Sequence, residues 1–572
     1  MEEWRIEKLI EIHVLKRQVE RKIDRFLGQE NCSHEVLEQK KLLNRIKDLS
    51  TSGDAYSRKT LKEYIKAILL EGVELYGLEL DGRLSERVEQ PRFFISEGCR
   101  ELDMILPFEC PEKLSTDDKF GILLSCMARS QKDERFAVEE LLKAEGMISG
   151  SAIFKENVDA VYGRMAPVLD MLQKLEYIVQ KIYQELYGLM ELDRLAYSSI
   201  NEVGFAGDGG YVYLWAERKI HLAFLKYTER EARIIQERAI SFDRHVGALN
   251  ENNPEVLCHR FDGARVTVTQ KPYFSARNCC IRVFNKNDVS FEELHSDERL
   301  KLLSKALVKT GQSMVFQGGL GTGKSTFMSM LYEFLDRDLH VGLLEDMFEM
   351  HILEKYGAER RVIEAQRTIN KTLQNGVETF LRMSVDVAGL GEARNGEALF
   401  SFIQLVQSVS VSAWMTAQVN CPENTVHRMK NMLMATGIYS EETAAAHDIV
   451  HNINFIVQNH SRGGDRFISE ICEIVPDTAL AIYGNNGNGE RSTEELERGY
   501  YIHQLQRDVV NTYTLNRIYD NRSGKGVFVN YPSQKFLDRA SRFPASEAIL
   551  KELFEAILMD TGMDHRLRVW WQ

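Results

Sequence analysis

The stretch VFQGGLGTGKSTFMSM, residues 315–330, decides the expected fold of this chain. Residues 318–325 satisfy the pattern G-x-x-x-x-G-K-[ST], in which backbone N–H groups turn toward phosphate oxygens where any Cβ would obstruct the approach. An apolar segment precedes this loop and the helical pattern TFMSMLYEFL follows it, as a strand, a phosphate loop and a helix require. The stretch therefore predicts a nucleoside triphosphate site in an α/β domain.

The side chains of this loop have separate expected roles. Lys324 brings a point charge to the β- and γ-phosphates, and the Ser325 hydroxyl is a ligand for magnesium. The following helix directs the positive end of its dipole at the phosphates. The expected nucleotide-binding residues are Gly318, Gly319, Gly321, Thr322, Gly323, Lys324, Ser325 and Thr326.

From about residue 291, apolar strand patterns alternate with helical ones. The expected strands are SMVFQG, HVGLLE, DVAGLG, SAWMTAQ, INFIVQ and FISEICEI. This order predicts a mainly parallel sheet with helices on both faces and an antiparallel edge near its C-terminal end. A polar linker, GNNGNGERSTEE, follows Pro476 and precedes a smaller region of helix and strand.

Two further regions are expected before this sheet. Residues 1–190 place apolar side chains at spacings of three and four, which predicts a helical bundle that docks onto another part of the assembly. For the first stripe, a membrane-surface helix is the alternative. That stripe consists of Leu9, Ile12, Leu15, Val19, Ile23 and Phe26. Residues 191–288 alternate around the turn GDGG and predict a small α+β domain.

Composition narrows the class of protein. The 572-residue chain has a net charge of −13, which gives it no general electrostatic attraction for nucleic acid. Its nine cysteines include no C-x-x-C pair, which favours a reducing compartment over a disulfide framework or a zinc ribbon. The N-terminus lacks the long apolar run of a signal peptide. These features predict a cytoplasmic protein.

One uncharged segment, residues 398–422, is long enough to cross a bilayer. It also contains glutamine, asparagine, serine and threonine side chains, which are costly in lipid. A helix followed by a buried strand accounts for the segment better, because buried central strands are commonly uncharged.

Acidic side chains follow two of the expected strands. Glu345 and Asp346 come at the end of HVGLLE, and Glu392 comes after DVAGLG. Ligands of an open α/β sheet bind at the carboxyl ends of its strands, so these carboxylates are expected near the γ-phosphate. There a carboxylate can position water, accept its proton or hold magnesium through water. A single acid after a strand is commonly a helix cap, but two such acids after a phosphate loop favour catalysis.

These motifs together resemble the type II/type IV secretion ATPase superfamily, and within it the tight-adherence pilus ATPases of CpaF type. LEDMFE, residues 344–349, resembles the family's acidic box IED-x-x-E. LRMSVDVAGLGEARNGEA, residues 381–398, resembles LRM-x-P-D-x-x-x-x-GE-x-R-x-x-EA, although the proline is missing. SRGGDRFISEI, residues 461–471, resembles a late strand pair of the family. In the small domain, RFDGARVTV and CCIRVF resemble R-x-P-D-G-x-R-V and L-x-I-R-x-F.

The resemblance implies a RecA-like P-loop ATPase domain at residues 289–478, preceded by the small α+β domain and the helical N-terminal extension. A C-terminal region would fill residues 479–572. It further implies a homohexamer that hydrolyses ATP with Mg²⁺ and powers pilus assembly or protein secretion across the inner membrane. The implied partner is an inner-membrane platform protein, with the chain cytoplasmic or peripheral at that membrane, and no nucleic acid partner is expected.

The resemblance also implies that arginines of one subunit's small domain act on its neighbour's nucleotide. They would neutralise charge developing on the γ-phosphate. The candidate arginine fingers at matching family positions are Arg260, Arg265 and Arg282, and Arg277 lies near them in the sequence.

The sequence departs from the family at the histidine box. Aligned on its threonine, asparagine and proline, SVSVSAWMTAQVNCP places Ser410 at the first histidine and Gln418 at the second. Gln418 can donate a hydrogen bond to a γ-phosphate or orient water, but it cannot titrate.

Two hypotheses therefore stand. The first is a divergent working motor in which Glu345, Glu392 and Gln418 are catalytic while Ser325 and Asp346 hold magnesium. The second is a nucleotide-binding ring scaffold with little or no turnover. Because the phosphate loop and both glutamates are present, the motor is favoured. A different P-loop enzyme, such as a kinase, would need a phosphoacceptor site and a lid segment, and the sequence offers no convincing example of either.

Overall fold

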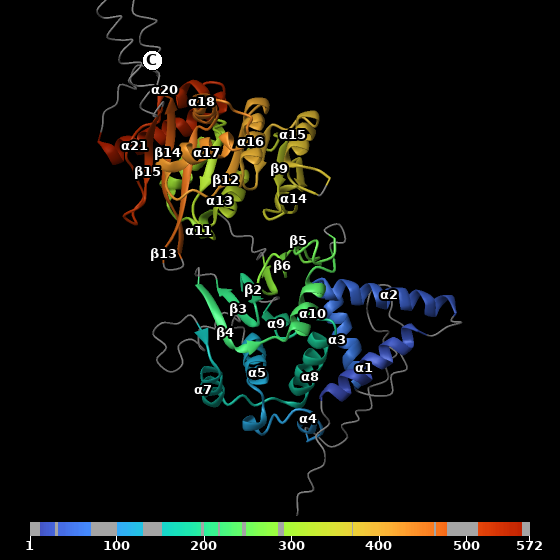
Figure 1. Cartoon of the computed structure of the whole chain (residues 1–572). Helices are drawn as coiled ribbons and strands as arrows, with labels where there is room; N and C mark the ends of the chain where they lie inside the picture. Colours follow the sequence, from blue (N-terminus) through green and yellow to red (C-terminus); the bar gives the residue numbers. More distant parts are fainter. Residues whose placement is uncertain are drawn as a thin grey trace, which may run out of the picture. The chain divides into compact units, whose positions relative to one another are not determined.

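The computed structural model divides into two compact units, Met1–Lys286 and Asn287–Gln572, and each is described by itself (Figure 1). All structural statements concern the residues that the structure describes. These are residues 12–28, 33–69, 100–129, 152–195, 200–214, 218–242, 247–283, 291–368, 370–462, 465–476 and 513–562.

The first unit begins with helices, as the apolar spacing predicts. They are α1 (Ile12–Leu27), α2 (His34–Thr51), α3 (Ala55–Leu69), α4 (Arg100–Ile105), α5 (Thr116–Arg129), α7 (Lys155–Met165), α8 (Met171–Leu186), α9 (Leu192–Leu195) and α10 (Glu229–Ala239). Helix α8 begins at a capping box: Asp170 Oδ1 accepts from the Gln173 N–H at 2.8 Å, and Gln173 Oε1 accepts from the Asp170 N–H at 3.0 Å.

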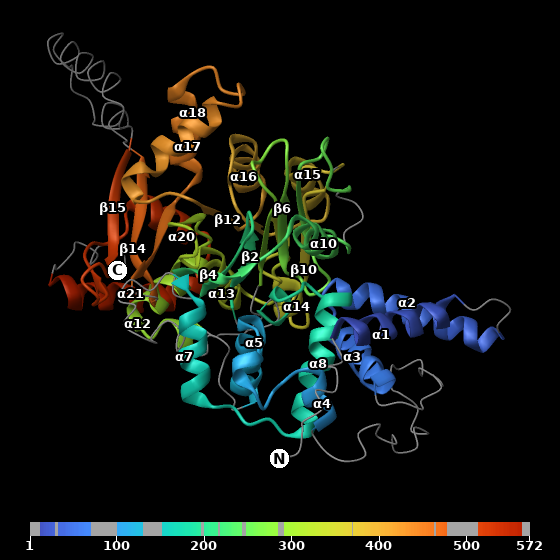
Figure 2. The ribbon, with the colours of Figure 1, turned by 60° about the horizontal axis from the view of Figure 1, so that its bottom comes forward.

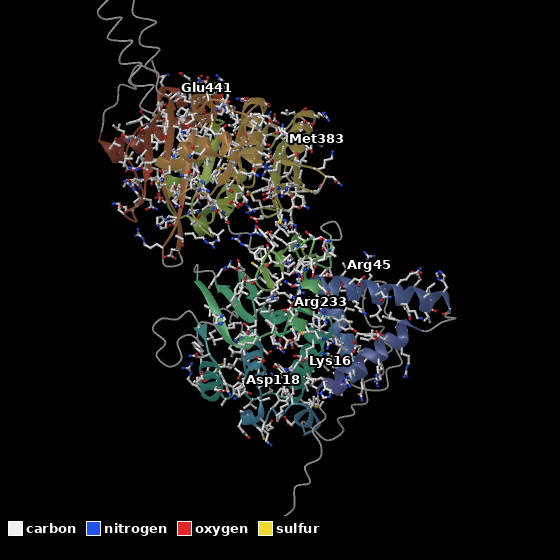
Figure 3. All side chains as sticks on the ribbon, in the orientation of Figure 1. Lys16, Arg45, Asp118, Arg233, Met383 and Glu441 are labelled. Carbon is white, nitrogen blue, oxygen red and sulfur yellow. The ribbon has the colours of Figure 1, made fainter. Side chains whose placement is uncertain are left out.

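The apolar stripe of α1 is part of a protein core. Val19 and Ile23 are fully buried, and α1 packs against α8 and α3. Lys16 lies on the same helix (Figure 3). Its Nζ forms an ion pair with Glu185 Oε2 on α8, at 3.0 Å. The stripe is therefore bundle core, and the membrane-surface alternative is wrong for these two positions. Leu9, which also belongs to the predicted stripe, lies outside the described residues.

A seven-stranded sheet follows, with the order β1-β4-β3-β2-β7-β6-β5. Its strands are β1 (Ala152–Ile153), β2 (Glu202–Ala206), β3 (Gly209–Leu214), β4 (Arg218–Lys226), β5 (Glu255–His259), β6 (Arg265–Thr269) and β7 (Asn278–Arg282). Only the β1–β4 pairing is parallel. Helices α5, α7 and α8 lie along one side of the sheet (Figure 2). The sequence interpretation missed β1, which comes from the predicted helical extension.

One hydrophobic core joins the helices before residue 190 to the strands after it. The core extends from Val19 on α1 to Ile281 on β7. Within it, the ring of Phe120 on α5 lies 5.1 Å from the ring of Phe224 on β4. The expected four-part domain division stays a prediction, but residue 190 does not separate two cores.

The second unit is built on a nine-stranded sheet with the order β10-β9-β11-β12-β8-β13-β14-β15-β16. Its strands are β8 (Met314–Gln317), β9 (Val341–Glu345), β10 (Val362–Gln366), β11 (Val387–Leu390), β12 (Ser412–Ala417), β13 (Phe455–Arg462), β14 (Asp465–Pro476), β15 (Tyr513–Asp520) and β16 (Val527–Phe528). Pairings from β10 to β13 are parallel, and those from β13 to β16 are antiparallel.

The predicted parallel sheet with an antiparallel C-terminal edge is confirmed, with two additions. β10 was not among the strands expected from the sequence, and its side chains are only half-buried, so its apolar signal is weak. β15 and β16 come from the region after the polar linker but extend the same sheet.

Helices cover both faces of this sheet, so that successive strand residues enter different cores (Figure 1). Phe316 and Trp414 pack in the core beneath α12, α13 and α21, whereas Val315 and Met415 pack in the core beneath α15 to α18. The helices of this unit are α11 (Phe291–Leu294), α12 (Glu298–Lys309), α13 (Lys324–Leu331), α14 (Ile352–Tyr356), α15 (Leu373–Arg382), α16 (Gly396–Ser408), α17 (Thr425–Met434), α18 (Glu442–Asn452), α20 (Gln534–Ala540) and α21 (Glu547–Thr561).

The uncharged segment 398–422 is a helix followed by a buried strand, as predicted. It contains most of α16 and all of β12, and every residue of β12 is buried. Among the described residues, no helix combines the length and the apolar character that a membrane span requires.

Candidate functional site

The phosphate loop connects β8 to α13, and its glycines at positions 318, 321 and 323 all have positive φ angles. Gly318 has φ 154°, and a Cβ there would lie 2.4 Å from the Asn459 carbonyl oxygen. Gly323, the N-cap of α13, has a left-handed φ of 84°. Other residues rarely adopt such angles, so the loop holds its shape only with these glycines.

Lys324 begins α13 and reaches back over the loop. Its side chain is buried, and Nζ donates to the carbonyl oxygens of Gly319 at 2.7 Å and Gly318 at 3.3 Å. The Thr322 hydroxyl also donates to the Gly319 carbonyl, at 3.0 Å. Ser325 lies in the first turn of α13, half-buried, and Thr326 is exposed. The lysine ammonium and the start of the helix therefore lie at the same end of β8.

Strand order brings Gln418 beside this loop. β12 lies directly between β8 and β11, with Ala417 level with Gln317. The next residues, Gln418 and Gly318, therefore leave the sheet side by side, and Gln418 is exposed. Neighbouring strands are about 4.8 Å apart. The strand that precedes Gln418 is therefore about 5 Å from β8, the strand that precedes Glu392 about 10 Å, and the strand of Glu345 about 14 Å.

Glu345 ends β9 with its side chain only 2 % exposed. Burial raises the pKa of this carboxyl to about 8. Its Oε2 accepts a hydrogen bond from the Glu349 N–H at 3.2 Å. A Cβ added to Gly391 would lie 2.8 Å from Glu345 Cγ, so the glutamate leans over the end of β11, toward Glu392.

The other two acids are held by arginines. Glu392 Oε2 lies 2.6 Å from Arg394 Nε, with the carboxylate side chain 17 % exposed. Asp346 Oδ1 lies 3.7 Å from Arg367 Nη1, just after β10. Each acid therefore remains close to the carboxyl edge of the sheet, where water and a nucleotide can reach it.

A buried chain of hydrogen bonds lies beneath the phosphate loop. Gln317 Nε2 donates to Gln458 Oε1 at 2.8 Å, and the Thr425 hydroxyl donates to Gln317 Oε1 at 2.7 Å. Thr425 begins α17, a few residues after Gln418. The last residue of β8 is thereby tied to the segment that follows Gln418, which fixes the position of Gln418 against the loop.

Comparison with known proteins identifies this part of the chain. Residues 260–490 match the family model described as Type II/IV secretion system protein. This stretch, less than half of the chain, is similar to proteins of that family. The predicted resemblance to the superfamily is confirmed, and the closer relation to CpaF-type ATPases stays a prediction. No curated protein matches the chain.

Solved structures of secretion ATPases align with the chain at low identity. The VirB11 ATPase of the Brucella suis type IV secretion system, in complex with sulphate, is 17% identical with a TM-score of 0.27, covering 48% of this chain and 88% of that chain. The Yersinia pseudotuberculosis ATPase DotB is 14% identical with a TM-score of 0.38, covering 64% of this chain and 92% of that chain. The pilus retraction motor PilT with bound ADP is 13% identical with a TM-score of 0.32, covering 65% of this chain and 89% of that chain. Identities and TM-scores this low say nothing about what this chain does.

Within the secretion-family domain, Ser410 does not join the candidate site. It precedes β12, and its hydroxyl donates to Asp386 Oδ1 at 2.6 Å. Because β12 has six residues, Ser410 lies about 20 Å along the strand from Gln418. Of the two residues aligned with the histidine box, only Gln418 is beside the phosphate loop.

The candidate arginines of the small sheet differ in exposure. Arg260 is only 2 % exposed, and its Nη2 donates to the Thr51 carbonyl at 3.4 Å, at the end of α2. An arginine that must reach another subunit cannot be enclosed in this way, so the structure argues against Arg260 as a finger. Arg265 and Arg282 are half-buried and lie directly opposite each other on β6 and β7.

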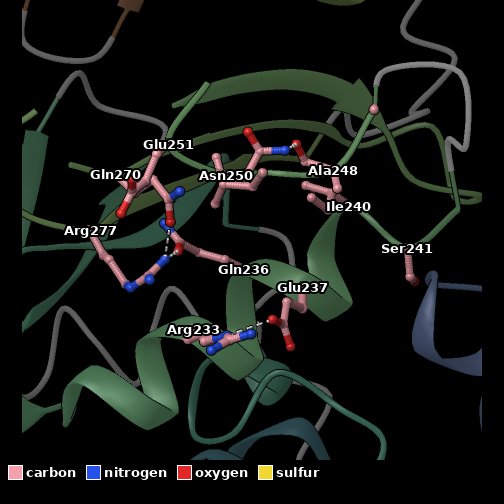
Figure 4. A pocket seen from close by; sticks show the side chains of 12 residues that line it. Arg233, Gln236, Glu237, Ile240, Ser241, Ala248, Asn250, Glu251, Gln270 and Arg277 are labelled. Carbon is pink, nitrogen blue, oxygen red and sulfur yellow. Dashed lines mark hydrogen bonds and ion pairs between the residues drawn. The ribbon is translucent and has the colours of Figure 1, made fainter. Parts of the chain in front are cut away.

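Arg277 is held within its own domain. Its Nε lies 2.6 Å from Glu229 Oε1. Its Nη1 donates to Gln236 Oε1 at 2.8 Å and to Gln270 Oε1 at 2.5 Å (Figure 4). Arg277, Gln236 and Gln270 form part of the wall of a cavity of about 620 Å³ between α10 and the loop at residues 247–251. Arg277 therefore supports that wall, and it was not at a matching family position.

Sequence reasoning missed the hydrogen-bonded glutamines beneath the loop. Gln317 and Gln458 end two apolar strand patterns, SMVFQG and INFIVQ. A polar residue at the same position of two expected strands was the available signal. Without the knowledge that β8 and β13 are neighbours, nothing in the sequence pairs the two side chains.

Proposed function

We propose that this chain is an ATP-hydrolysing motor of the type II/type IV secretion superfamily. It acts as a homohexamer that powers pilus assembly or protein secretion across the inner membrane, against an inner-membrane platform protein. The observation that carries the proposal is the side-by-side departure of Gly318 and Gln418 from β8 and β12, with Glu392 following the next strand, β11. A phosphate loop, an amide and a carboxylate at adjacent strand ends are the groups that phosphoryl transfer to water requires.

The loop binds the nucleotide through its backbone and Lys324. The ammonium, which contacts the Gly318 and Gly319 carbonyls, exchanges these partners for phosphate oxygens when ATP binds. The positive end of α13 adds to this attraction. Thr326 follows Ser325 in the same helical turn and completes the expected set.

Ser325 and Asp346 would hold Mg²⁺ in this proposal. Both offer oxygen atoms, the donor type that Mg²⁺ prefers, and Mg²⁺ commonly keeps its waters while bound by one or two protein groups and the phosphates. Within the described ranges, no group of three or more His, Cys, Asp or Glu residues could hold a metal ion. In this proposal the ion arrives with the nucleotide, where it neutralises phosphate charge.

Glu392 is the proposed acceptor of the proton from the attacking water. Its strand is one step closer to β8 than that of Glu345, and its carboxylate is partly exposed. Gln418 orients the water or donates to the γ-phosphate through its amide. Glu345 carries a proton at neutral pH, because burial raises its pKa to about 8, and in that state it can donate a hydrogen bond within the site.

Arg265 and Arg282 are the proposed arginine fingers acting on a neighbouring subunit's nucleotide. They lie directly opposite each other on adjacent strands, so that one phosphate could accept charge-assisted hydrogen bonds from both. Opening and closing of the small domain on ATP turnover would then pass displacement to the platform protein.

The competing proposal is a ring scaffold that binds ATP with little or no turnover. Gln418 favours it, because an amide cannot carry the charge of a histidine. The two proposals differ in a single measurable quantity, the rate of phosphate release.

Phosphate release with Mg-ATP decides between them, with Lys324→Ala and Glu392→Gln measured alongside and the assembly state recorded for every sample. A motor shows turnover that either substitution abolishes while wild type and Glu392→Gln form the same ring. Ring formation and ATP binding with release no greater than in Lys324→Ala would overturn the motor and establish the scaffold.

A further inference from the structure

The hairpin of β13 and β14 reaches the carboxyl edge of the sheet. β13 is parallel to β8 and β14 is antiparallel to β13, so β14 begins at the edge where the phosphate loop lies. Its second residue, Arg466, pairs with Ser461 on β13. Arg466 therefore stands at the same edge as the loop.

Arg466 also lies on the face of the sheet that α13 covers. Ile468, two residues further along β14, packs in the same core as Phe327 of α13. Alternate residues of a strand share a face, so the Arg466 side chain leaves the sheet at the beginning of that helix.

The contact with the phosphate loop is direct. The Cβ position of Gly323 lies 3.3 Å from Arg466 Cδ, and Arg466 Nε is buried. Gly323 is the N-cap of α13. The aliphatic part of the arginine therefore rests on the last glycine of the loop, and its guanidinium lies beside the first turn of the helix.

Three positive groups converge at this place: the N-terminus of α13, the Lys324 ammonium and the Arg466 guanidinium. An anion bound here would interact favourably with all three. The backbone of such a loop holds the α- and β-phosphates, while its lysine reaches the β- and γ-phosphates. The planar guanidinium presents paired N–H donors that match two phosphate oxygens.

We propose that Arg466 binds the diphosphate part of the nucleotide held by its own subunit's phosphate loop. The inference rests on the proposed nucleotide site and adds to it a cation supplied in cis from β14. Because the contact is to the diphosphate and not to the γ-phosphate, Arg466 contributes equally to binding ATP, ADP and pyrophosphate. Glu392 and Gln418, in contrast, act on the terminal phosphate.

The experiment measures binding of Mg-pyrophosphate, Mg-ADP and Mg-ATP to the full chain by calorimetry. Arg466→Ala is compared with wild type and with Arg462→Ala. Arg462 is a matched control, because it lies on the same hairpin, is exposed, and places its guanidinium 5.8 Å from the Phe467 ring centroid. Arg466→Lys, which keeps a charge, and the unfolding temperature of each ligand-free variant separate binding from folding.

The proposal expects Arg466→Ala to weaken all three ligands by a similar factor of roughly 10 to 100, the size of a charged hydrogen bond. Arg466→Lys should recover part of the affinity, and Arg462→Ala should bind like wild type. Unchanged pyrophosphate and ADP affinities in Arg466→Ala would overturn the proposal, as would an equal loss in Arg462→Ala.

Failure of the inference and failure of the proposed function give different results. A wild-type chain that releases phosphate while Arg466→Ala binds ADP normally refutes only the role of Arg466. A chain that binds ADP through Arg466 but never releases phosphate refutes the motor and leaves the inference intact. A wild-type chain that binds none of the three ligands refutes both.

Discussion

Glu345 and Gly391 are in contact across two neighbouring strand ends. The glutamate Cγ lies 2.8 Å from the position of a Gly391 Cβ, and the Gly391 N–H donates to the Leu344 carbonyl at 2.7 Å. Glycine is needed just before Glu392, because the buried Glu345 side chain of β9 occupies the space that a Cβ would take there. The two candidate catalytic glutamates depend on each other's position through this contact.

Gly391→Ala should displace Glu345 and lower turnover. A methyl group at 2.8 Å must push the carboxyl aside, and overpacking of this kind costs about 1–3 kcal/mol. Phosphate release and the free energy of unfolding in urea are the measurements. Gly163→Ala is the control, because nothing lies within 4 Å of its Cβ position and alanine favours its helix by about 1 kcal/mol. Normal turnover in Gly391→Ala would contradict the inferred link between the two glutamates.

The stability of the protein should fall as the pH rises, and Glu345 is the cause. Burial raises its pKa from 4.5 to about 8 in the folded state, so the folded chain keeps a proton that the unfolded chain releases. The favourable contribution is fully present below pH 4.5 and is lost as the pH rises to about 8, with a slope of at most about 1.4 kcal/mol per pH unit.

Glu345→Gln, which stays neutral, should therefore gain stability relative to wild type between about pH 5 and pH 8. Urea unfolding of both proteins across this range checks the expectation. A difference in unfolding free energy that stays constant with pH would show that the carboxyl is not protonated in the folded state.

Gln317→Leu should destabilise the second unit. The substitution leaves the buried Thr425 hydroxyl and Gln458 side chain without the partners they have at 2.7 Å and 2.8 Å. Each unsatisfied buried group costs about 1–3 kcal/mol. Because Thr425 is close in sequence to Gln418, turnover should fall further than nucleotide affinity.

The exposed Gln534 on α20 is a matched control for this substitution. Gln534→Leu should change the free energy of unfolding by less than about 0.5 kcal/mol. Equal effects of the two substitutions would mean that the buried hydrogen bonds are not responsible.

Arg58→Ala should unfold the first unit more easily. Arg58 Nη2 lies 2.7 Å from Asp193 Oδ2, and both side chains are buried. Removing the arginine leaves an uncompensated buried carboxylate, which costs about 3–5 kcal/mol. Hydrogen exchange of α3 and α9 measures the effect.

Lys41→Ala tests the specificity of that result. Lys41 pairs with Glu38 at 2.7 Å, but both side chains are exposed, so the loss of Lys41 should leave the stability of the unit nearly unchanged. Arg58→Ala with Asp193→Asn should recover part of the stability, and no recovery would argue against the buried charge as the cause.

The sequence was sufficient for features that depend on local pattern. Motif spacing identifies the phosphate loop, and apolar runs identify β12 and the strand that precedes Glu392. Buried parallel strands carry the strongest such signal. The half-buried β10 carries a weak one and was missed.

Features that depend on distant segments could not be predicted in this way. Arg260 is enclosed by the end of α2, and its partner Thr51 there precedes it by 209 residues. β15 returns to a sheet whose previous strand ends at Pro476. Arg466 meets Gly323 only because β14 reverses beside β13. Motif spacing identifies the chemistry of a site, whereas contacts of this kind are set by the packing of the whole unit.

The continuous core of the first unit makes its helices a lever. α8 has 16 residues, so its first turn lies about 24 Å along the helix axis from its last residue. A rotation of the sheet by about 10° would then sweep that turn through about 4 Å, because Val19 to Ile281 form one packed body. A partner bound at the first turn of α8 would therefore be displaced further than the sheet itself moves.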